Sequence, residues 1–348
     1  MKAYIHILTW NDRRYLPDLF DSLENQTYQD FSVRILDNGS TDGTVDYLQQ
    51  YYPHALTTRN TKNIGFAEGH NQLVRFTLDH LSESEINDSV IIWMNSDMIL
   101  EKDAIKNLIE EFELDKTVGM LQPKLYRAFG ENLGDEILEE TVKSDILDTT
   151  GLVVGKSWRM SDRGAGEMDK GQYDNQTDIF AATGTMALIN IKAIFDTLIQ
   201  NEMFDKDFFA YREDCDLAWR LQKNGWKAKF VPSAIAYHYR GMYGAQKLSI
   251  WRKLINRKSN NPFLAAYSTR NQLYVLLKNL TFGDLIFGLP WIAVGETGRV
   301  VYGMVFEPQT RKRLISGLRS IPSMLEKRKW IFKNAKVKEK EIRKYARN

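Results

Sequence analysis

The stretch that decides the fold is Val90–Met98, which reads Val-Ile-Ile-Trp-Met-Asn-Ser-Asp-Met. Val90–Met94 is β-branched and aromatic, a pattern that predicts a buried strand. Asn95, Ser96 and Asp97 follow directly, and in an open α/β sheet ligands bind beyond the carboxyl ends of the strands. An amide, a hydroxyl and a carboxylate suit a hydrated divalent cation that also holds phosphate oxygens. The same three residue types are common in turns, so the tripeptide alone leaves a simple turn open.

Strands and helices alternate on both sides of this stretch. Strand patterns cover residues 4–8, 31–36, 56–59 and 118–122, and helical patterns cover about 14–25, 44–51 and 102–114. Alternation at this spacing predicts an α/β fold with a mostly parallel sheet, right-handed crossovers and flanking helices.

The early strands also end in polar residues. The first strand runs into Thr9-Trp10-Asn11, and the second ends at Asp37. A carboxylate at that position can accept hydrogen bonds from a nucleobase or a ribose. The alternative is that Asp37 and Asp42 only shape the turn and cap the next helix. Gly65 lies ahead of a further helix and permits close approach of a ligand to the backbone, but the dinucleotide Gly-x-Gly-x-x-Gly is absent from this stretch.

Composition indicates one large domain, alone or with an appendage. The 348 residues are 43% apolar and 26% charged, as in ordinary soluble proteins. The net charge of +2 hides an asymmetry, because residues 307–348 hold fourteen Lys/Arg and four Glu and therefore carry +10. A basic tail on a mildly acidic body indicates a tail that meets an anionic surface. The single cysteine, Cys215, excludes an intrachain disulfide and fits a reducing compartment.

We expect neither a cleaved signal peptide nor a membrane-spanning helix. The N-terminus enters a strand-like run at once, and the best apolar stretch, Leu285–Val294, is short and contains Pro290.

Residues 124–178 break the alternation. They are polar and contain glycine, with Arg159 and the run Arg163-Gly164-Ala165-Gly166-Glu167. A long segment without periodicity predicts a functional loop or lid, with a solvated surface loop as the equal alternative.

A cluster of acids marks a helix that begins near Glu213 and ends at Asn224-Gly225. Asp214 lies on the apolar stripe of this helix, so its carboxylate faces inward. A carboxylate there is either a dipole-stabilised cap or a positioned base in a partly dry cleft. Three acids in four positions exceed what a cap needs, which favours the base. Further along, His238 follows a strand end, and its position there is the only reason to consider it a ligand.

The chain changes character after about residue 248, where helical segments follow one another. These segments combine apolar stripes with Trp330 and many Lys/Arg, a pattern that is typical of an interfacial helix that lies on a membrane. The alternative is a helical appendage that packs on the sheet domain or on a second subunit.

The ordered set of motifs over residues 1–240 resembles family 2 inverting glycosyltransferases with the GT-A fold, in the rhamnosyltransferase-like branch. The matching residues are Thr9-Trp10-Asn11, Asp37-Asn38-Gly39-Ser40-Thr41-Asp42, Asn63-Ile64-Gly65-Phe66-Ala67 with Asn71, Asn95-Ser96-Asp97, Gly184, Phe208-Phe209-Ala210-Tyr211-Arg212-Glu213-Asp214-Cys215-Asp216-Leu217 with Arg220, and Pro232 with His238. Residues 163–167 and Arg270-Asn271 resemble the same branch less specifically.

This resemblance implies a GT-A domain over residues 1–245 and a C-terminal helical, basic region over 246–348. It implies that Asp214, with Glu213, is catalytic, and that Asp97 and His238 bind Mg²⁺ or Mn²⁺. The implied nucleotide-sugar residues are Thr9, Asn11, Asp37, Gly65, Asn71, Asn95, Ser96 and Asp97. The acceptor or lid candidates are Arg159, Arg163, Gly184 and Arg270. Asn95 stands where the strict Asp-x-Asp motif has Asp, which leaves Asp97 as the expected ligand.

The implied reaction is inverting transfer of a sugar from a nucleotide-diphosphate donor to a hydroxyl of a glycan or lipid-linked saccharide, in cell-surface polysaccharide synthesis. L-Rhamnose is suggested by the branch alone, and both dTDP and UDP donors remain open. The expected location is cytoplasmic, peripheral on the inner face of the membrane, with no nucleic-acid partner and no prediction of oligomeric state. The rival readings are a nucleotidyltransferase and a non-catalytic binding protein. A nucleotidyltransferase would normally have a Gly-rich loop with Lys or Arg directly after the first strand, but this chain has Thr9-Trp10-Asn11 there. A non-catalytic protein that binds nucleic acid would have basic and aromatic residues on a defined binding motif, whereas the basic tail shows only a mixed amphipathic pattern.

Overall fold

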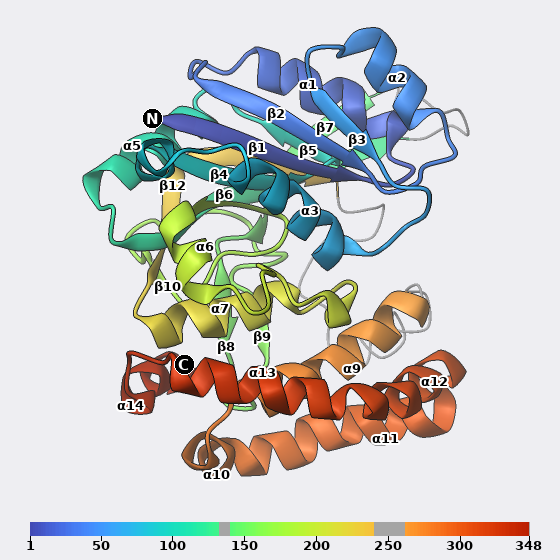
Figure 1. Ribbon diagram of the computed structural model, residues 1–348, viewed down its shortest axis with the longest axis vertical. Coiled ribbons are helices and arrows are strands. Elements are labelled where there is room, and N and C mark those ends of the chain that lie inside the picture. The colour runs from blue at the N-terminus through green and yellow to red at the C-terminus, as the bar shows by residue number, and fades with distance from the viewer. Residues whose placement is uncertain (132–139, 240–261, 348) are drawn as a thin grey trace.

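The computed structural model describes residues 1–131, 140–239 and 262–347, and one curled sheet forms its centre (Figure 1). The strand order is β10-β12-β6-β11-β4-β1-β2-β3, with β5 paired to β12 and β7 paired to β6. The strands are β1 (Lys2–Thr9), β2 (Phe31–Asp37), β3 (Leu56–Arg59), β4 (Ser89–Asn95), β5 (Met98–Leu100), β6 (Val118–Glu131), β7 (Glu140–Thr149), β10 (Asp178–Ile179), β11 (Met186–Asn190) and β12 (Lys227–Tyr239). Parallel pairing joins β3, β2, β1 and β4, and it also joins β6 to β12, while β11 runs antiparallel to both of its neighbours.

Helices cover both faces of the sheet. They are α1 (Leu16–Glu24), α2 (Thr44–Tyr51), α3 (Phe66–Leu78), α4 (Glu83–Asn87), α5 (Ala104–Leu114), α6 (Ile191–Thr197) and α7 (Glu213–Asn224). Alternate residues of β4 enter two different cores: Val90, Ile92 and Met94 pack with α1 and α5, whereas Ile91 and Trp93 pack with α3, α6 and α7. The predicted buried strand is therefore buried on both faces, as its continuous apolar run requires. The α/β fold with flanking helices is confirmed.

The prediction of an irregular loop or lid over residues 124–178 was wrong for much of its length. Strand β6 continues to Glu131 and pairs with β7, and β8 (Leu152–Val154) pairs with β9 (Met160–Asp162) in a separate small sheet. Each pairing joins two strands that follow one another in the chain, and the polar, glycine-containing sequence of this segment did not show the alternation expected of strands.

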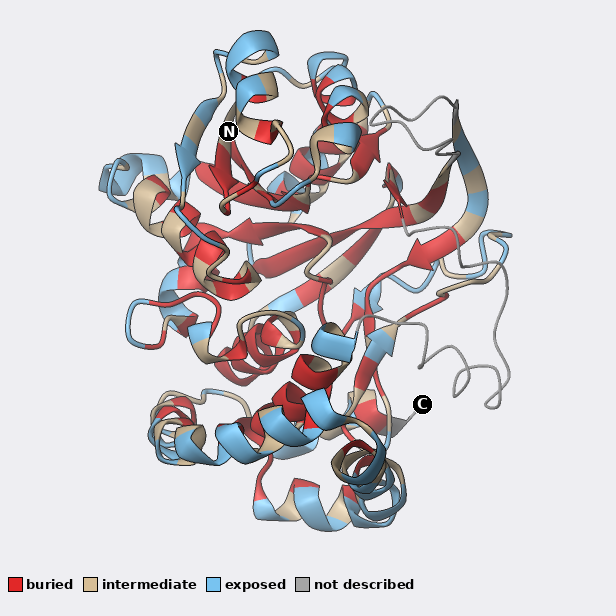
Figure 2. Cartoon of the chain, turned by 90° about the vertical axis from the view of Figure 1, so that its right-hand side faces the viewer, coloured by how far each residue is buried: buried red, intermediate tan, exposed pale blue. Residues whose placement is uncertain are grey.

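The C-terminal region is helical, as expected. It consists of α9 (Pro262–Asn279), α10 (Phe282–Trp291), a π-helical turn η3 (Ile292–Glu296), α11 (Thr297–Phe306), α12 (Pro308–Gly317), α13 (Ile321–Lys333) and α14 (Glu339–Arg343). Figure 1 shows α10 and α11 as the layer farthest from the sheet, with α9 and α13 between them and α7. Exposed residues predominate in this outer layer, whereas the sheet is buried (Figure 2). The expected boundary at residues 245 and 246 lies outside the described residues.

No helix in the described parts of the chain combines the length and the apolar character needed to cross a membrane.

Candidate active site

The ends of β1 and β2 are linked by polar side chains. The Asp37 carboxylate is buried and accepts hydrogen bonds from the backbone N–H groups of Gly39 and Ser40, at 3.3 and 3.1 Å. Asn11 has a positive φ of 59°, and its Oδ1 accepts a hydrogen bond from the N–H of Thr41 at 2.8 Å. The turn-shaping role of Asp37 is thus observed. The same contacts bring Asn11 and Asp37 to one edge of the sheet.

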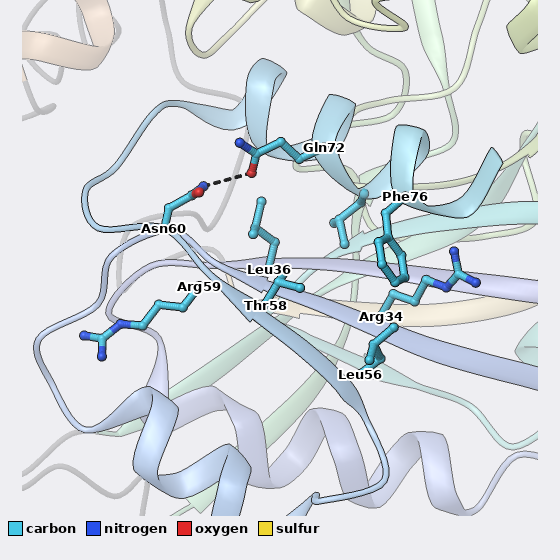
Figure 3. A pocket seen from close by; sticks show the side chains of 9 residues that line it. Arg34, Leu36, Leu56, Thr58, Arg59, Asn60, Gln72 and Phe76 are labelled. Atoms are coloured by element: carbon cyan, nitrogen blue, oxygen red, sulfur yellow. Dashed lines mark hydrogen bonds between the residues drawn. The ribbon is translucent and has the colours of Figure 1, made fainter. Parts of the chain in front are cut away.

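A pocket of about 190 Å³ lies between α3 and the strands β2 and β3, of which β3 forms the edge of the sheet (Figure 3). Its lining residues are Arg34, Leu36, Leu56, Thr58, Arg59, Asn60, Gln72, Leu73 and Phe76. Arg59 also approaches the Asp37 carboxylate, with Nε 3.4 Å from Oδ2. The pocket therefore borders the predicted nucleotide edge without containing any of the predicted site residues.

The residues after β4 enter two separate arrangements. Ser96 Oγ donates a hydrogen bond of 2.6 Å to Asp12 Oδ2, which also accepts from the N–H of Trp10 at 2.9 Å. Burial raises the pKa of Asp12, and the Ser96 hydrogen bond opposes this shift. Sequence reasoning did not select Asp12, although it directly follows Asn11. Asn95, the last residue of β4, is half-buried.

Asp97 meets His238 where β5 pairs with β12. The register pairs Met98 with His238, and His238 Nε2 lies 3.3 Å from Asp97 Oδ1. On the other side of the ring, Nδ1 lies 2.9 Å from Oδ2 of Asp148, which belongs to β7. Burial alone would lower the pKa of His238, but the charges of Asp97 and Asp148 and their hydrogen bonds raise it to about 10. The fold thus brings the two predicted metal residues together and adds Asp148, which the sequence did not reveal.

These residues fit a divalent cation. Oδ1 of Asp97 is buried and pairs with Nε2 of His238, so a cation bound here would take the place of the proton between these two atoms. Two neighbouring ligands of an octahedral Mg²⁺, each about 2.1 Å from the ion, are separated by about 3.0 Å, close to the observed 3.3 Å. Asp148 would orient the imidazole, as carboxylates often do for metal-bound histidines. Within the described ranges no group of three or more His, Cys, Asp and Glu could hold a metal ion, so other positions would fall to water and phosphate.

The predicted catalytic acids stand at the start of α7. Asp214 is half-buried, and its Oδ2 accepts a hydrogen bond of 3.1 Å from the N–H of Gly184. Its Oδ1 accepts from the N–H of Cys215 at 2.7 Å. Glu213 is 5% exposed, and burial together with the charge of Asp214 raises the pKa of its carboxyl well above the usual value. The two carboxyl groups therefore differ: the raised pKa of Glu213 favours its protonated form, and Asp214 is the more exposed of the two.

Gly65 and Asn71 both contact the segment that leads to these acids. Gly65 has a φ of 94°, and a Cβ on it would lie 2.5 Å from the carbonyl oxygen of Phe209. The Asn71 side chain donates a hydrogen bond from Nδ2 to the carbonyl of Phe204 at 2.7 Å, and its Oδ1 accepts one from the N–H of Phe204 at 2.9 Å. The structure therefore places both residues as supports of residues 204–209.

The three arginine candidates all have protein partners. Arg159 makes a bidentate ion pair with Glu296 of the π-helical turn, with both distances 2.7 Å. Arg163 donates to Thr150 and to the carbonyl of Gln176, inside the stretch between β7 and β10. Arg270 of α9 donates to backbone carbonyls just before α7. The acceptor or lid role expected for them remains a prediction.

Residues 4–194 match the family described as glycosyl transferase family 2. The chain belongs to this family. An N-acetylglucosaminyl-diphospho-decaprenol L-rhamnosyltransferase of Mycobacterium tuberculosis is 26% identical over 237 residues, which are 67% of this chain and 74% of that protein. The rhamnosyltransferase WbbL of Escherichia coli K12 is 24% identical over 238 residues, 68% of this chain and 83% of that protein. The expected family resemblance is confirmed.

Solved structures agree with the fold of this family 2 glycosyltransferase. The structure of GalNAc-T7 with UDP, GalNAc and Mn²⁺ matches with a TM-score of 0.58 at 12% identity, over 93% of this chain and 57% of that one. Staphylococcus aureus TarS, residues 1–349, matches with a TM-score of 0.52 at 14% identity, over 93% and 81% of the two chains. Both are GT-A transferases, so the GT-A architecture is confirmed.

Proposed function

We propose that this glycosyltransferase moves a sugar from a nucleotide-diphosphate donor to a hydroxyl group, with inversion at the anomeric carbon. The observation that carries the proposal is the placement of Asp214, which is partly exposed at the start of α7 and whose carboxylate accepts a hydrogen bond from the N–H of Gly184. A carboxylate so placed accepts the acceptor's proton as the hydroxyl attacks. A single displacement inverts the centre, and no second nucleophilic carboxylate is required.

The donor occupies the edge of the sheet in this proposal. Thr9, Asn11 and Asp37 contact the nucleoside, while Asp97 and His238 hold the divalent metal. A bound Mg²⁺ or Mn²⁺ supplies a Lewis acid that neutralises the leaving diphosphate. The metal fit rests on the buried Oδ1 of Asp97 and its distance of 3.3 Å from Nε2 of His238.

The relatives' names guide the choice of substrates. Three of them are rhamnosyltransferases, and one acts on a diphospho-decaprenol-linked sugar. We therefore propose L-rhamnose from dTDP-rhamnose as the first donor to test, with UDP-sugars as the alternative. The proposed acceptor is a lipid-linked saccharide of cell-surface polysaccharide synthesis.

A donor panel tests the reaction. The full chain is incubated with dTDP-rhamnose or UDP-sugars, with and without Mn²⁺, and with a short lipid-linked N-acetylglucosamine acceptor. The expected result is release of nucleoside diphosphate and a product heavier by one sugar, whose anomeric configuration is the inverse of the donor's by NMR. A product that carries a nucleotidyl group, with release of a sugar phosphate, would replace the proposal by a nucleotidyltransferase. Donor binding without any turnover would favour a non-catalytic binding protein.

The outer helices support a membrane location for this reaction. Residues 282–306 contain two acids, Asp284 and Glu296, and both are buried in ion pairs, with Arg343 and Arg159. The opposite side of the same helices exposes large apolar side chains. These are Phe282, Leu285, Ile286, Leu289, Val294, Val301, Val305 and Phe306. We call this set the apolar stripe, and a stripe without exposed acids suits the boundary between headgroups and acyl chains.

Basic residues accompany the apolar stripe. Arg311, Lys312, Arg319, Lys329 and Lys333 of the next helices are exposed. Each basic residue near an anionic leaflet contributes about 1 kcal/mol. We therefore propose that α10 and α11 dock the enzyme on the cytoplasmic face of an anionic membrane, where a lipid-linked acceptor is presented.

Co-sedimentation with liposomes tests the docking. Binding should require anionic lipid, weaken with salt and be lost in Leu289→Asp with Val294→Asp. Leu114→Asp is the matched control, because Leu114 is 82% exposed on α5, outside the apolar stripe. Deleting residues 307–348 is unsuitable, because it removes the core residues Met324 and Ile331. Indifference of the full chain to anionic liposomes at low salt would make the stripe a packing or oligomer surface instead.

A further inference from the structure

The backbone just before the predicted base is held in an unusual conformation. Phe209, Tyr211 and Arg212 have positive φ angles of 65°, 69° and 74°, and none of them is glycine. Non-glycine residues adopt such angles only where the surrounding structure enforces them, and they cluster at functional sites. Helix α7 begins at the next residue, Glu213. Whatever holds residues 208–212, here called the base loop, also sets where Asp214 stands.

One side chain of α9 gathers the carbonyls of the base loop. Nδ2 of Asn271 lies 2.9, 2.9 and 2.7 Å from the carbonyl oxygens of Phe208, Ala210 and Tyr211. Asn271 itself is fully buried. An amide nitrogen has two hydrogens, so three acceptors share them. Without this donor, three carbonyl oxygens that converge on a buried side chain would lose the partner they share and would repel one another.

Arg270, the neighbour of Asn271, also binds this part of the backbone. Its Nη2 donates to the carbonyls of Asp207 and Phe208 at 2.7 and 3.1 Å. Its Nε and Nη2 also donate to Oδ1 of Asn271, at 2.9 and 2.7 Å, which fixes the direction of that amide. The guanidinium therefore binds the start of the base loop. It also orients Asn271, which binds the middle of the loop.

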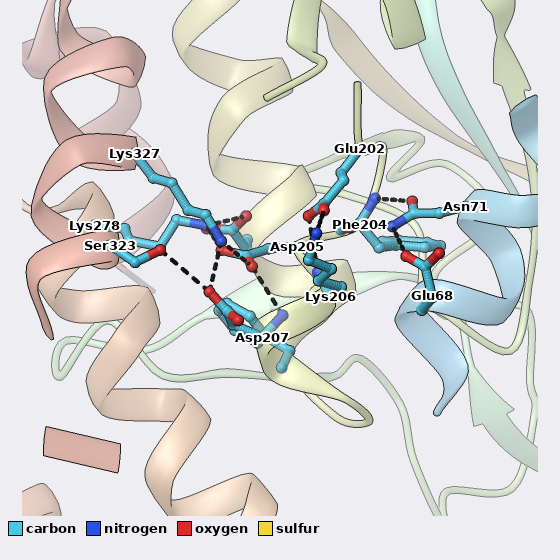
Figure 4. A network of polar contacts seen from close by, with 12 residues as sticks. Glu68, Asn71, Glu202, Phe204, Asp205, Lys206, Asp207, Lys278, Ser323 and Lys327 are labelled. Carbon is cyan, nitrogen blue, oxygen red and sulfur yellow. Dashed lines mark hydrogen bonds and ion pairs between the residues drawn. The ribbon is translucent and has the colours of Figure 1, made fainter. Parts of the chain in front are cut away.

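Buried ion pairs anchor both flanks of the base loop to the same helices. Before the loop, Asp205 accepts from Lys278 of α9 and Lys327 of α13, at 2.6 and 2.5 Å (Figure 4). After it, Asp216 of α7 accepts from Lys278 at 2.8 Å. With its flanks fixed in this way, the loop itself is the part that depends on Asn271 and Arg270.

We propose that Asn271 and Arg270 are positioning residues of the transfer reaction, which hold the base loop so that the Asp214 carboxylate stays on the N–H of Gly184. They touch neither donor nor acceptor in this account and act through the backbone of residues 207–211. The inference rests on the proposed function, because it assigns a base that must be positioned. It also gives the C-terminal helices a part in catalysis, beside the proposed docking on a membrane.

Three variants of the full chain test the positioning role. Asn271→Ala removes the donor, and Arg270→Lys keeps a positive charge but loses the planar fork that reaches two carbonyls and one amide. Tyr274→Phe is the matched control, because it removes another buried hydrogen bond of α9, from the Tyr274 hydroxyl to the carbonyl of Gly317, and keeps the ring that packs on Phe208 and Arg270. For each variant we would measure kcat, the KM for donor, the pH profile of kcat, and hydrogen exchange of the peptide covering residues 205–215.

A positioning role predicts that Asn271→Ala lowers kcat by about 10–10²-fold, the scale expected for a small misplacement of a reacting group, with little change in the donor KM. The acid limb of the pH profile should move, and exchange in residues 205–215 should rise. Arg270→Lys should show the same changes at smaller size, which keeps the test usable if Asn271→Ala does not fold. Tyr274→Phe should leave all four readouts near wild type.

Two results would overturn the inference. One is a fall in kcat that only follows the folded fraction, with an unmoved pH profile. The other is unchanged hydrogen exchange in residues 205–215 of both Asn271→Ala and Arg270→Lys. Failure of the proposed function would look different, because wild type itself would then transfer no sugar while the exchange measurement still reported on the base loop.

Discussion

The contrast between Glu213 and Asp214 gives the sharpest prediction. Asp214→Asn removes the proposed base and should lower kcat by about 10²–10⁴-fold, or about 2.7–5.5 kcal/mol of transition-state stabilisation at about 1.36 kcal/mol per tenfold. Glu213→Gln should cost less than about 1 kcal/mol, or less than about fivefold in kcat. The reason is structural, because burial and the Asp214 charge raise the pKa of Glu213 well above its usual value and so favour its protonated form. Glutamine has the shape of that neutral acid.

Stability provides a second readout for Glu213→Gln. The folded wild type keeps the Glu213 proton, whereas the unfolded chain releases it near the ordinary pKa, so wild-type stability falls as pH rises above that value. The variant lacks this loss, and its melting temperature relative to wild type should therefore be higher at pH 8 than at pH 5.

The assay is initial-rate release of nucleoside diphosphate, with calorimetry to show that both variants still bind donor. Equal losses of kcat in Asp214→Asn and Glu213→Gln would refute the reasoning, because Glu213 would then act as an ionised group. Near-normal turnover of Asp214→Asn would remove Asp214 as the base. A Glu213→Gln variant whose relative melting temperature does not change with pH would show that Glu213 is not held neutral.

Three further predictions concern the rest of the molecule. Asp97→Ala should abolish the rise in melting temperature that Mn²⁺ with nucleoside diphosphate gives wild type, and an unchanged rise would exclude Asp97 as a ligand. Burial lowers the pKa of His70 to about 3, so its share of the stability is lost as pH falls below about 6.5, at up to about 1.4 kcal/mol per pH unit. His70→Phe should flatten that slope in urea unfolding at pH 5 and 7.5, and parallel curves for the two proteins would contradict it. Lys278→Met removes a buried partner of Asp205 and Asp216 and should cost about 3–5 kcal/mol of unfolding free energy; a loss under about 1 kcal/mol in chemical denaturation would show that the remaining cations suffice.

The local sequence was sufficient to predict the fold class and the position of the sheet edge. Val90–Met94 is apolar at every position, so it had to be buried on both faces, and the polar residues after it had to lie at a strand end. The acids of α7 and the basic C-terminal helices were readable for the same reason, because burial and charge follow from the spacing of residues along one element.

Which distant residues contact these side chains could be learned only from the folded structure. Asp148 lies 90 residues from His238 and meets it through strands β7 and β12, in a stretch whose local pattern indicated a loop. Asn271 lies 60 residues after Tyr211, whose carbonyl it binds, and nothing in an isolated Arg-Asn pair points to the base loop. The period of a helix or strand tells which side of it is buried, but not which distant segment covers that side. Pairing across such separations is set by the packing of the whole chain, and the packing decided how the predicted base is held.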